Sequence, residues 1–156
     1  MKIQISPNWW SCFATSFAIV LKMPVRNLFL EVGHDGSEII FPDLPEPFGR
    51  RTIHPQELID VCLGRGFALM MVEAIPSMSG NYEIQFKEGN ISRLTRYMSM
   101  YTGVVCGVNQ DLKPHAIAWD RKSFYDPIGK VTEKTEMAID CFLALVPIRK
   151  EDGSIS

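Results

Sequence analysis

A mostly apolar stretch near the amino terminus runs from Phe13 to Leu21 and lies between Pro7 and Pro24. Its length and its lack of glycine and proline favour a helix over a strand. A helix that is apolar on nearly every side belongs in the middle of a hydrophobic core. The pattern therefore predicts a central buried helix that carries Cys12 in its first turn.

Shorter elements follow in the next part of the chain. Glycine and proline mark their ends, and apolar stripes at helical spacing or continuous apolar runs mark their interiors. In chain order, we expect a helix to Val32 stopped by Gly33, an ordered surface excursion over 33–53, a helix from His54-Pro55 to Leu63, a strand over 67–75, a loop over 77–90 with a short strand at 82–86, and a helix over 92–101.

The last third of the chain alternates between apolar and polar residues over short distances, which is typical of half-buried strands. Strands are predicted at 103–108, 114–120 and 123–126, and they form an antiparallel meander. A helix over 135–142 and a strand over 143–148 complete the domain, and the tail over 150–156 is expected to fray. Helices first and a sheet afterwards predict an α+β fold, a single domain over 1–156, with a small antiparallel sheet from the C-terminal half packed on the Cys12 helix.

Composition and charge exclude several classes of function. The chain has 156 residues, 46% of them hydrophobic and 22% charged, and a net charge of −2 without a basic cluster. Neither nucleic acid nor a membrane is therefore an expected partner, and the longest apolar run is too short to span a bilayer. No signal peptide is recognised at the amino terminus, so we expect a cytoplasmic protein.

Four cysteines are present, without the spacing of a zinc site or a disulfide framework. We expect no metal and no cofactor. Cys62, Cys106 and Cys141 lie in apolar runs and are expected in the core. Cys12 differs from them because the positive end of the helix dipole favours its thiolate.

A nucleophilic thiol needs a base, and the base needs an acceptor that orients it. His115 begins one predicted strand, and Asp126 ends the next. In a hairpin that turns at Arg121-Lys122, position 115 lies near 128, so the two side chains meet at one end of the sheet. Cys12, His115 and Asp126 are thus the candidate catalytic residues. Taken singly, His115 also fits a core histidine, and Asp126 fits a turn residue before Pro127.

The segment Ser11-Cys12-Phe13-Ala14-Thr15-Ser16 resembles the sequence around the nucleophile of papain-like cysteine peptidases. Pro114-His115-Ala116-Ile117 and Tyr125-Asp126-Pro127 look like the histidine and aspartate strands of the small C39-like (bacteriocin-leader-peptidase-like) members. This resemblance implies a papain-like fold and an oxyanion-hole side chain before the cysteine. Gln4 is the candidate for that side chain, and Asn8 is the alternative. The glycine that precedes the Ser-Cys pair in papain is replaced here by Trp10.

Three further residues are candidates for the substrate cleft. Trp10 lies two residues before Cys12, whereas His34 and Asp35 lie in a loop flanked by glycines. Large aromatic residues are usually core or rim, and the loop pair also fits a solvated loop. His54 is interpreted as the start of a helix.

These residues predict a papain-like thiol hydrolase that cleaves a peptide or isopeptide bond of a peptide or protein substrate. Related acyl chemistry remains an alternative, namely glutamine deamidation, acyl transfer or cleavage of a peptidoglycan amide. A catalytically silent binding or inhibitor protein on the same scaffold is a second class, because a fold does not determine an activity. A purely structural domain is the third. The sequence determines neither the specificity nor the oligomeric state.

Overall fold

The structure of the protein is a computed structural model that describes residues 1–74 and 88–149. Four helices and six strands lie in this part of the chain. They are α1 (Cys12–Val20), α2 (Val25–Val32), α3 (Pro55–Gly64), β1 (Phe67–Glu73), α5 (Glu88–Met100), β2 (Gly103–Val108), β3 (Pro114–Trp119), β4 (Phe124–Asp126), β5 (Lys130–Thr132) and β6 (Ala138–Pro147).

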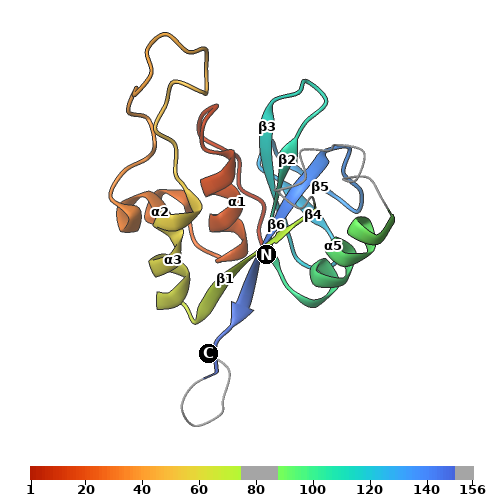
Figure 1. Cartoon of the computed structure of the whole chain (residues 1–156). Helices are drawn as coiled ribbons and strands as arrows, with labels where there is room; N and C mark the ends of the chain where they lie inside the picture. The colour runs from red at the N-terminus through yellow and green to blue at the C-terminus, as the bar shows by residue number, and fades with distance from the viewer. Residues whose placement is uncertain (75–87, 150–156) are drawn as a thin grey trace.

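All six strands belong to one antiparallel sheet with the order β1-β6-β2-β3-β4-β5. The strands β2 to β5 are neighbours in sequence and in space, whereas β6 returns and inserts between β1 and β2. Figure 1 shows α1, α2 and α3 on one side of the sheet and α5 on the other. The fold is therefore α+β, as predicted from the order of elements.

Successive side chains of the central strands point to opposite faces of the sheet and supply two apolar layers. Val104 and Leu143 pack in the layer that contains α1, whereas Val105 and Phe142 pack in the layer that contains α5. Because both faces are covered, β2 and β6 read as continuous apolar runs rather than as alternating ones.

The helix α1 lies at the centre of the first layer. Phe17, Ala18 and Ile19 are fully buried, which explains why the helix is apolar on nearly every side. The buried hydroxyl of Ser16 donates a hydrogen bond of 3.0 Å to the carbonyl oxygen of Ala116 on β3. This bond ties α1 to the strand that carries His115.

The predicted helices at 12–20, 25–32 and 55–64 are confirmed. Gly33 ends α2 in the left-handed region, with φ of 95°, a conformation that glycine adopts without steric cost. Pro55 stands at the first position of α3, where its missing N–H costs nothing, and the backbone N–H of His54 donates to Glu57 at 2.9 Å. The meander of β2, β3 and β4 is confirmed as well.

The helix predicted over 135–142 is wrong. Residues 138–147 form β6, the longest strand of the sheet, and a short additional strand, β5, precedes it. The apolar residues of 137–142 fit one face of a helix, but pairing with β1 on one side and β2 on the other satisfies the backbone along nearly the whole segment. Long-range pairing therefore overrides the local pattern.

Two other expectations lie outside the described residues: the short strand at 82–86 and the frayed tail over 150–156. The helix predicted at 92–101 is present and begins earlier, at Glu88. Within the described ranges, no single helix has the length and hydrophobicity needed to cross a bilayer. Only α1 and α2 together meet those criteria, and their axes bend by 106° at the junction.

Candidate active site

Cys12 is the first residue of α1, and its side chain is partly exposed. The nine residues of α1 end in the core, and no acidic side chain lies in the first turn to offset the positive end of the helix dipole. The preceding Ser11 is buried and stands at the N-cap position. Cys12 therefore stands at the end of α1 where the unpartnered backbone N–H groups and the positive end of the helix dipole lie.

The hairpin of β3 and β4 brings His115 and Asp126 together. Ala118 lies opposite Tyr125 and Trp119 opposite Phe124, so the same register continued places 115 opposite 128. His115 Nε2 lies 2.9 Å from Asp126 Oδ1, and the backbone N–H of Ile128 donates to the same oxygen at 3.2 Å. The structure thus brings this predicted pair into contact through a register that the turn alone determines.

The surroundings of His115 favour the protonated form of its imidazole. The hydrogen bond with Asp126, followed by a hydrogen bond with Cys12, raises the pKa of His115 to about 9 against the opposing effect of burial. Because Nε2 is bound to Asp126, Nδ1 is the ring nitrogen left for the Cys12 sulfur. The three candidate catalytic residues therefore lie at one site, with His115 bound to Asp126 and with Cys12 and His115 in the lining of the same two cavities.

Cys12 and His115 together line two adjoining cavities, one of about 360 Å³ and one of about 420 Å³. The first has a largely apolar wall that includes Trp9, Trp10, Phe13, Pro47 and Ile53. The second has more polar and charged residues in its lining, among them Asn8, Glu46, Asn109, Asp111 and Lys113. The loop over 33–53 contributes to the lining of both cavities and the β2–β3 connection to that of the second, and the two segments rise at the same end of the molecule in Figure 1.

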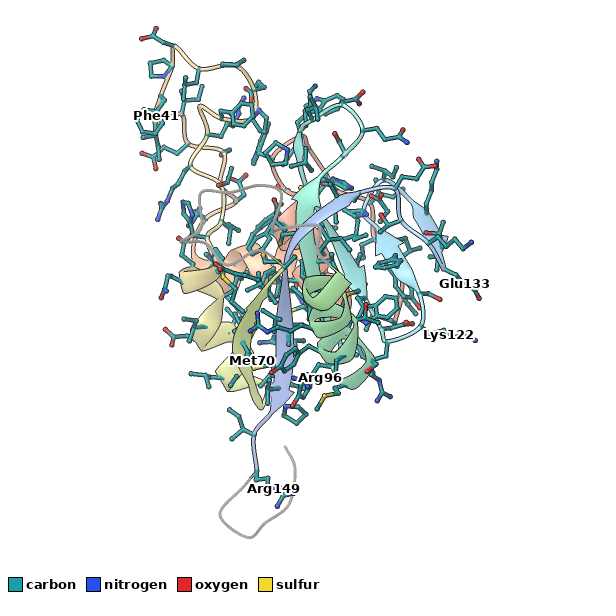
Figure 2. The ribbon with its side chains drawn as sticks, turned by 45° about the vertical axis from the view of Figure 1, so that its right-hand side comes forward. Phe41, Met70, Arg96, Lys122, Glu133 and Arg149 are labelled. Carbon is teal, nitrogen blue, oxygen red and sulfur yellow. The ribbon has the colours of Figure 1, made fainter. Side chains whose placement is uncertain are left out.

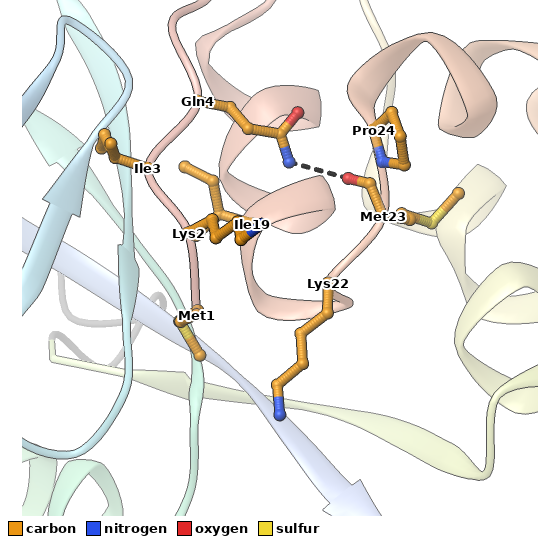
Figure 3. A pocket seen from close by; sticks show the side chains of 8 residues that line it. All are labelled: Met1, Lys2, Ile3, Gln4, Ile19, Lys22, Met23 and Pro24. Carbon is orange, nitrogen blue, oxygen red and sulfur yellow. Dashed lines mark hydrogen bonds between the residues drawn. The ribbon is translucent and has the colours of Figure 1, made fainter.

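Gln4 does not lie at Cys12. Its Nε2 donates to the carbonyl of Met23 at 2.7 Å, and its Oε1 accepts from the N–H of Val25 at 2.9 Å. Figure 3 shows Gln4 in a separate cavity of about 500 Å³ with Ile19 and Lys22, which lie at the far end of α1. Both ends of the amide fasten the amino-terminal segment to the α1–α2 junction, so the prediction of an oxyanion-hole role for Gln4 does not fit its position.

Asn8, the alternative to Gln4, does lie beside the candidate nucleophile. It lines the more polar cavity together with Cys12 and His115. Its Oδ1 accepts a hydrogen bond of 3.1 Å from the backbone N–H of Trp10, and this orients the side-chain amide. Of the two predicted amides, Asn8 is therefore the one that lies in the same cavity as Cys12.

Trp10 lines the apolar cavity as predicted, with the guanidinium of Arg50 stacked 4.0 Å above its ring. His34 and Asp35 are not among the described residues that line either of the two cavities. The ring of His34 lies 2.6 Å from Glu57, and Asp35 accepts from the N–H of Ser37 at 3.0 Å. Both residues hold the base of the loop over 33–53 in place.

Cys106 and Cys141 were expected in the core, but both are partly exposed and line the apolar cavity. Cys62 is buried as predicted, and desolvation raises the pKa of its thiol to about 11. Cys106 and Cys141 lie directly opposite each other on β2 and β6. Sequence reasoning missed this pair because it placed 141 in a helix, where no cross-strand partner exists.

The chain matches no family model and no curated protein. In the part of the chain that the structure describes, no group of three or more His, Cys, Asp or Glu side chains is arranged to hold a metal ion.

Proposed function

We propose that this protein is a papain-like thiol hydrolase that cleaves a peptide or isopeptide bond. The observation that carries the proposal is the contact of 2.9 Å between His115 and Asp126 in cavities that also contain Cys12 at the start of α1. Nucleophile, base and orienting carboxylate come from three separate segments. The proposal gives each of them one role in thiol catalysis.

The raised pKa of His115 favours a resting ion pair of Cys12 thiolate and His115 imidazolium at neutral pH. The thiolate attacks the carbonyl carbon, and the C–N bond breaks as the imidazolium gives its proton to the departing amine. Neutral His115 then takes a proton from water, whose oxygen attacks the thioester carbon and releases the Cys12 thiolate. Asp126 keeps the ring oriented and stabilises its positive charge throughout.

The tetrahedral intermediates carry a negative oxygen that needs donors. The backbone N–H of Cys12, at the start of α1, is one candidate because the first N–H groups of a helix have no partner within the helix. The Asn8 side-chain amide is the second, since it lines the same cavity. This pair replaces the predicted role of Gln4.

A polypeptide substrate fits the site better than the side-chain amide of a free glutamine. Two cavities of similar size meet at Cys12 and His115, so chain on each side of the scissile bond has space. Deamidation and acyl transfer use the same thioester and differ in the departing amine and in the acceptor. Product analysis by mass spectrometry distinguishes the three reactions.

The decisive experiment measures alkylation of each cysteine by iodoacetamide at pH 6, followed by peptide mapping. Cys12 is expected to react far faster than Cys62 and Cys106, whose pKa values are raised by burial and by the neighbouring Cys141 thiol respectively. Cys141 serves as an internal control, because a hydrogen bond from Cys106 lowers its pKa without any contribution from His115.

In the His115→Ala variant, rapid labelling of Cys12 should disappear while labelling of Cys141 persists. If Cys12 of the wild type reacts no faster than Cys62, the proposal is wrong, and a silent binding protein becomes the better interpretation. An electrophilic activity-based probe compared between wild type and Cys12→Ala gives the same answer without knowledge of the substrate.

A further inference from the structure

The loop over 38–49 exposes an unusual number of large apolar side chains. Each of five residues leaves 48–57% of its surface open to solvent: Ile39, Ile40, Phe41, Leu44 and Phe48. The loop projects beyond the body of the fold, and Figure 2 shows Phe41 near its outer end. Single exposed apolar residues are common on protein surfaces, but several of them on one projecting segment form a contiguous patch. Such a patch marks an interaction site.

The shape of this loop is set by its own hydrogen bonds. The N–H groups of Ile40 and Phe41 both donate to the Gly49 carbonyl, at 2.8 and 3.0 Å. Closer to the base, Arg51 donates to Glu38 at 2.7 Å and Thr52 donates to Gly36 at 2.9 Å. The apolar side chains are therefore presented on a preorganised support, which lowers the entropic cost of binding.

The loop is continuous with the candidate active site. Pro47 lines both cavities beside Cys12, and Ile53 lines the apolar one. Arg50 joins the two regions: it binds Glu46 at 2.7 Å and stacks on the ring of Trp10. Trp9, which is 84% exposed and lines both cavities, extends the apolar surface toward the nucleophile.

The net charge of the loop distinguishes between its possible binding partners, a lipid surface and a polypeptide. Residues 35–51 contain four carboxylates, those of Asp35, Glu38, Asp43 and Glu46, and two guanidinium groups, which gives a local charge of −2. An anionic lipid surface would repel this segment. A polypeptide with apolar side chains meets no such penalty, and the apolar surface leads it directly to the thiol.

We infer that the loop over 38–49 and the apolar cavity form one binding surface for an apolar segment of a polypeptide substrate, next to the bond that Cys12 attacks. This inference rests on the proposed function. It adds the chemical class of the substrate and a specificity element outside the catalytic unit.

Cleavage profiling of a proteome-derived peptide library tests the inference. Mass spectrometry of the products is expected to show apolar residues enriched at least about tenfold on one side of the cleaved bond, a ratio that corresponds to about 1.4 kcal/mol. In the double variant Phe41→Ser/Leu44→Ser, the enrichment should fall several-fold, with the iodoacetamide reactivity of Cys12 unchanged. Leu30→Ser on α2 is the matched control, since Leu30 is 76% exposed, and its profile should equal that of the wild type.

Other outcomes overturn the inference. The inference is refuted if Cys12 is alkylated selectively but no library peptide is cleaved. It is also refuted if the double variant cleaves with the same residue preference as the wild type. In both cases the proposal of a reactive Cys12 thiol still stands. A wild-type dimer in gel filtration that becomes a monomer in the double variant assigns the loop to a second copy of the chain. Flotation of the wild type with phosphatidylcholine vesicles, lost in the double variant, assigns it to lipid.

A separate observation concerns the two cysteines in the wall of the apolar cavity. Cys106 and Cys141 are directly paired on antiparallel strands and line the same cavity. Directly paired residues have Cβ atoms about 4.5–5.5 Å apart, close to the spacing of about 3.5–4.5 Å in a disulfide. The register shift that follows Cys106 gives the backbone room to adjust there.

We infer that Cys106 and Cys141 form a dithiol site that peroxide converts into a cross-strand disulfide. The Cys141 thiolate attacks one oxygen of hydrogen peroxide, forming a sulfenic acid and releasing hydroxide. The Cys106 sulfur then attacks the sulfenic sulfur and displaces its oxygen, so that two thiols and one peroxide give one disulfide and two waters. A hydrogen bond from the Cys106 thiol stabilises the Cys141 thiolate and lowers the pKa of Cys141. Cys141 is therefore the first of the two to react.

Non-reducing peptide mapping after stoichiometric hydrogen peroxide tests this site. We expect a linked 106–141 peptide pair that dithiothreitol separates. Cys106→Ser should leave Cys141 as a sulfenic acid that dimedone traps, whereas Cys62→Ser should not alter the link. Absence of the link after peroxide treatment, or a link from Cys12 to either cysteine in its place, overturns the inference.

Discussion

The two ends of α1 contain very different environments. At the carboxyl end, Gln4, Met23 and Val25 satisfy one another around the larger cavity, and its described lining includes Lys2 and Lys22 but no acidic or histidine side chain. At the amino end, Cys12 adjoins the His115–Asp126 pair, and the buried Trp10 Nε1 and Ser11 Oγ have no hydrogen-bond partner among the described residues. Cavity volume therefore does not identify the site. The paired titratable side chains beside Cys12 and the unsatisfied polar groups do, because perturbed pKa values and buried polar groups without partners are concentrated at functional sites.

The strongest test of this contrast is Cys12→Ser. A serine hydroxyl is far less acidic than a thiol, so the ion pair with His115 is lost, and peptide cleavage should fall by about 10⁴-fold or more. Circular dichroism should be unchanged, because Cys12 is partly exposed at the start of the helix. If the variant retains cleavage within tenfold of the wild type, Cys12 is not the nucleophile.

His115→Ala is expected to reduce the cleavage rate by about 10²–10⁴-fold, since the proton donor for the departing amine is removed. His34→Ala is the matched control. His34 also pairs with a carboxylate, that of Glu57, but lies outside both active-site cavities. Equal losses in the two variants, measured with the same peptide, would contradict a special role for His115.

Asn8→Ala and Gln4→Ala compare the two ends directly. Loss of an oxyanion donor at Asn8 should lower kcat by about 10²-fold with little effect on stability. Gln4→Ala should instead lower the free energy of unfolding by about 1–3 kcal/mol, because two backbone groups lose their partner, and leave the reactivity of Cys12 intact. Urea denaturation and single-turnover kinetics on both variants separate these effects, and a reversed pattern would restore Gln4 to the site.

The pH dependence gives the smallest but most specific effect. Cleavage should decline as pH rises through about 9, where His115 loses its proton. Asp126→Asn removes the largest cause of the raised pKa, so this alkaline limb should move to lower pH. An unchanged limb would show that another group titrates there.

Stability should follow the same titration. The pKa of His115 rises from the ordinary value of 6.5 in the unfolded chain to about 9 in the folded protein, so folding favours the protonated ring. The resulting stabilisation is fully present below pH 6.5 and is lost as pH rises through about 9. Denaturation series between these two values should show a steeper decline in the wild type than in Asp126→Asn.

Local patterns in the sequence were sufficient for much of the fold. The glycine after Val32, the His54-Pro55 pair and the apolar stretch after Cys12 each predicted a helix boundary that the structure confirms. The placement of His115 near Asp126 followed from a tight hairpin, because a turn at Arg121-Lys122 determines the register of both strands. These are short-range constraints, and short-range information is what a sequence displays most directly.

Long-range pairing decided the rest. Residues 138–147 fit either a helix or a strand locally, and only the pairing with β1 and β2 selects the strand and sets Cys141 opposite Cys106. Gln4 was the predicted oxyanion-hole side chain, but its amide is bound at the opposite end of α1. The sequence by itself determined the chemistry-bearing residues and their local elements. The tertiary structure alone decided which of them share a cavity, because that depends on contacts between segments about 100 residues apart, such as Ser16 with Ala116.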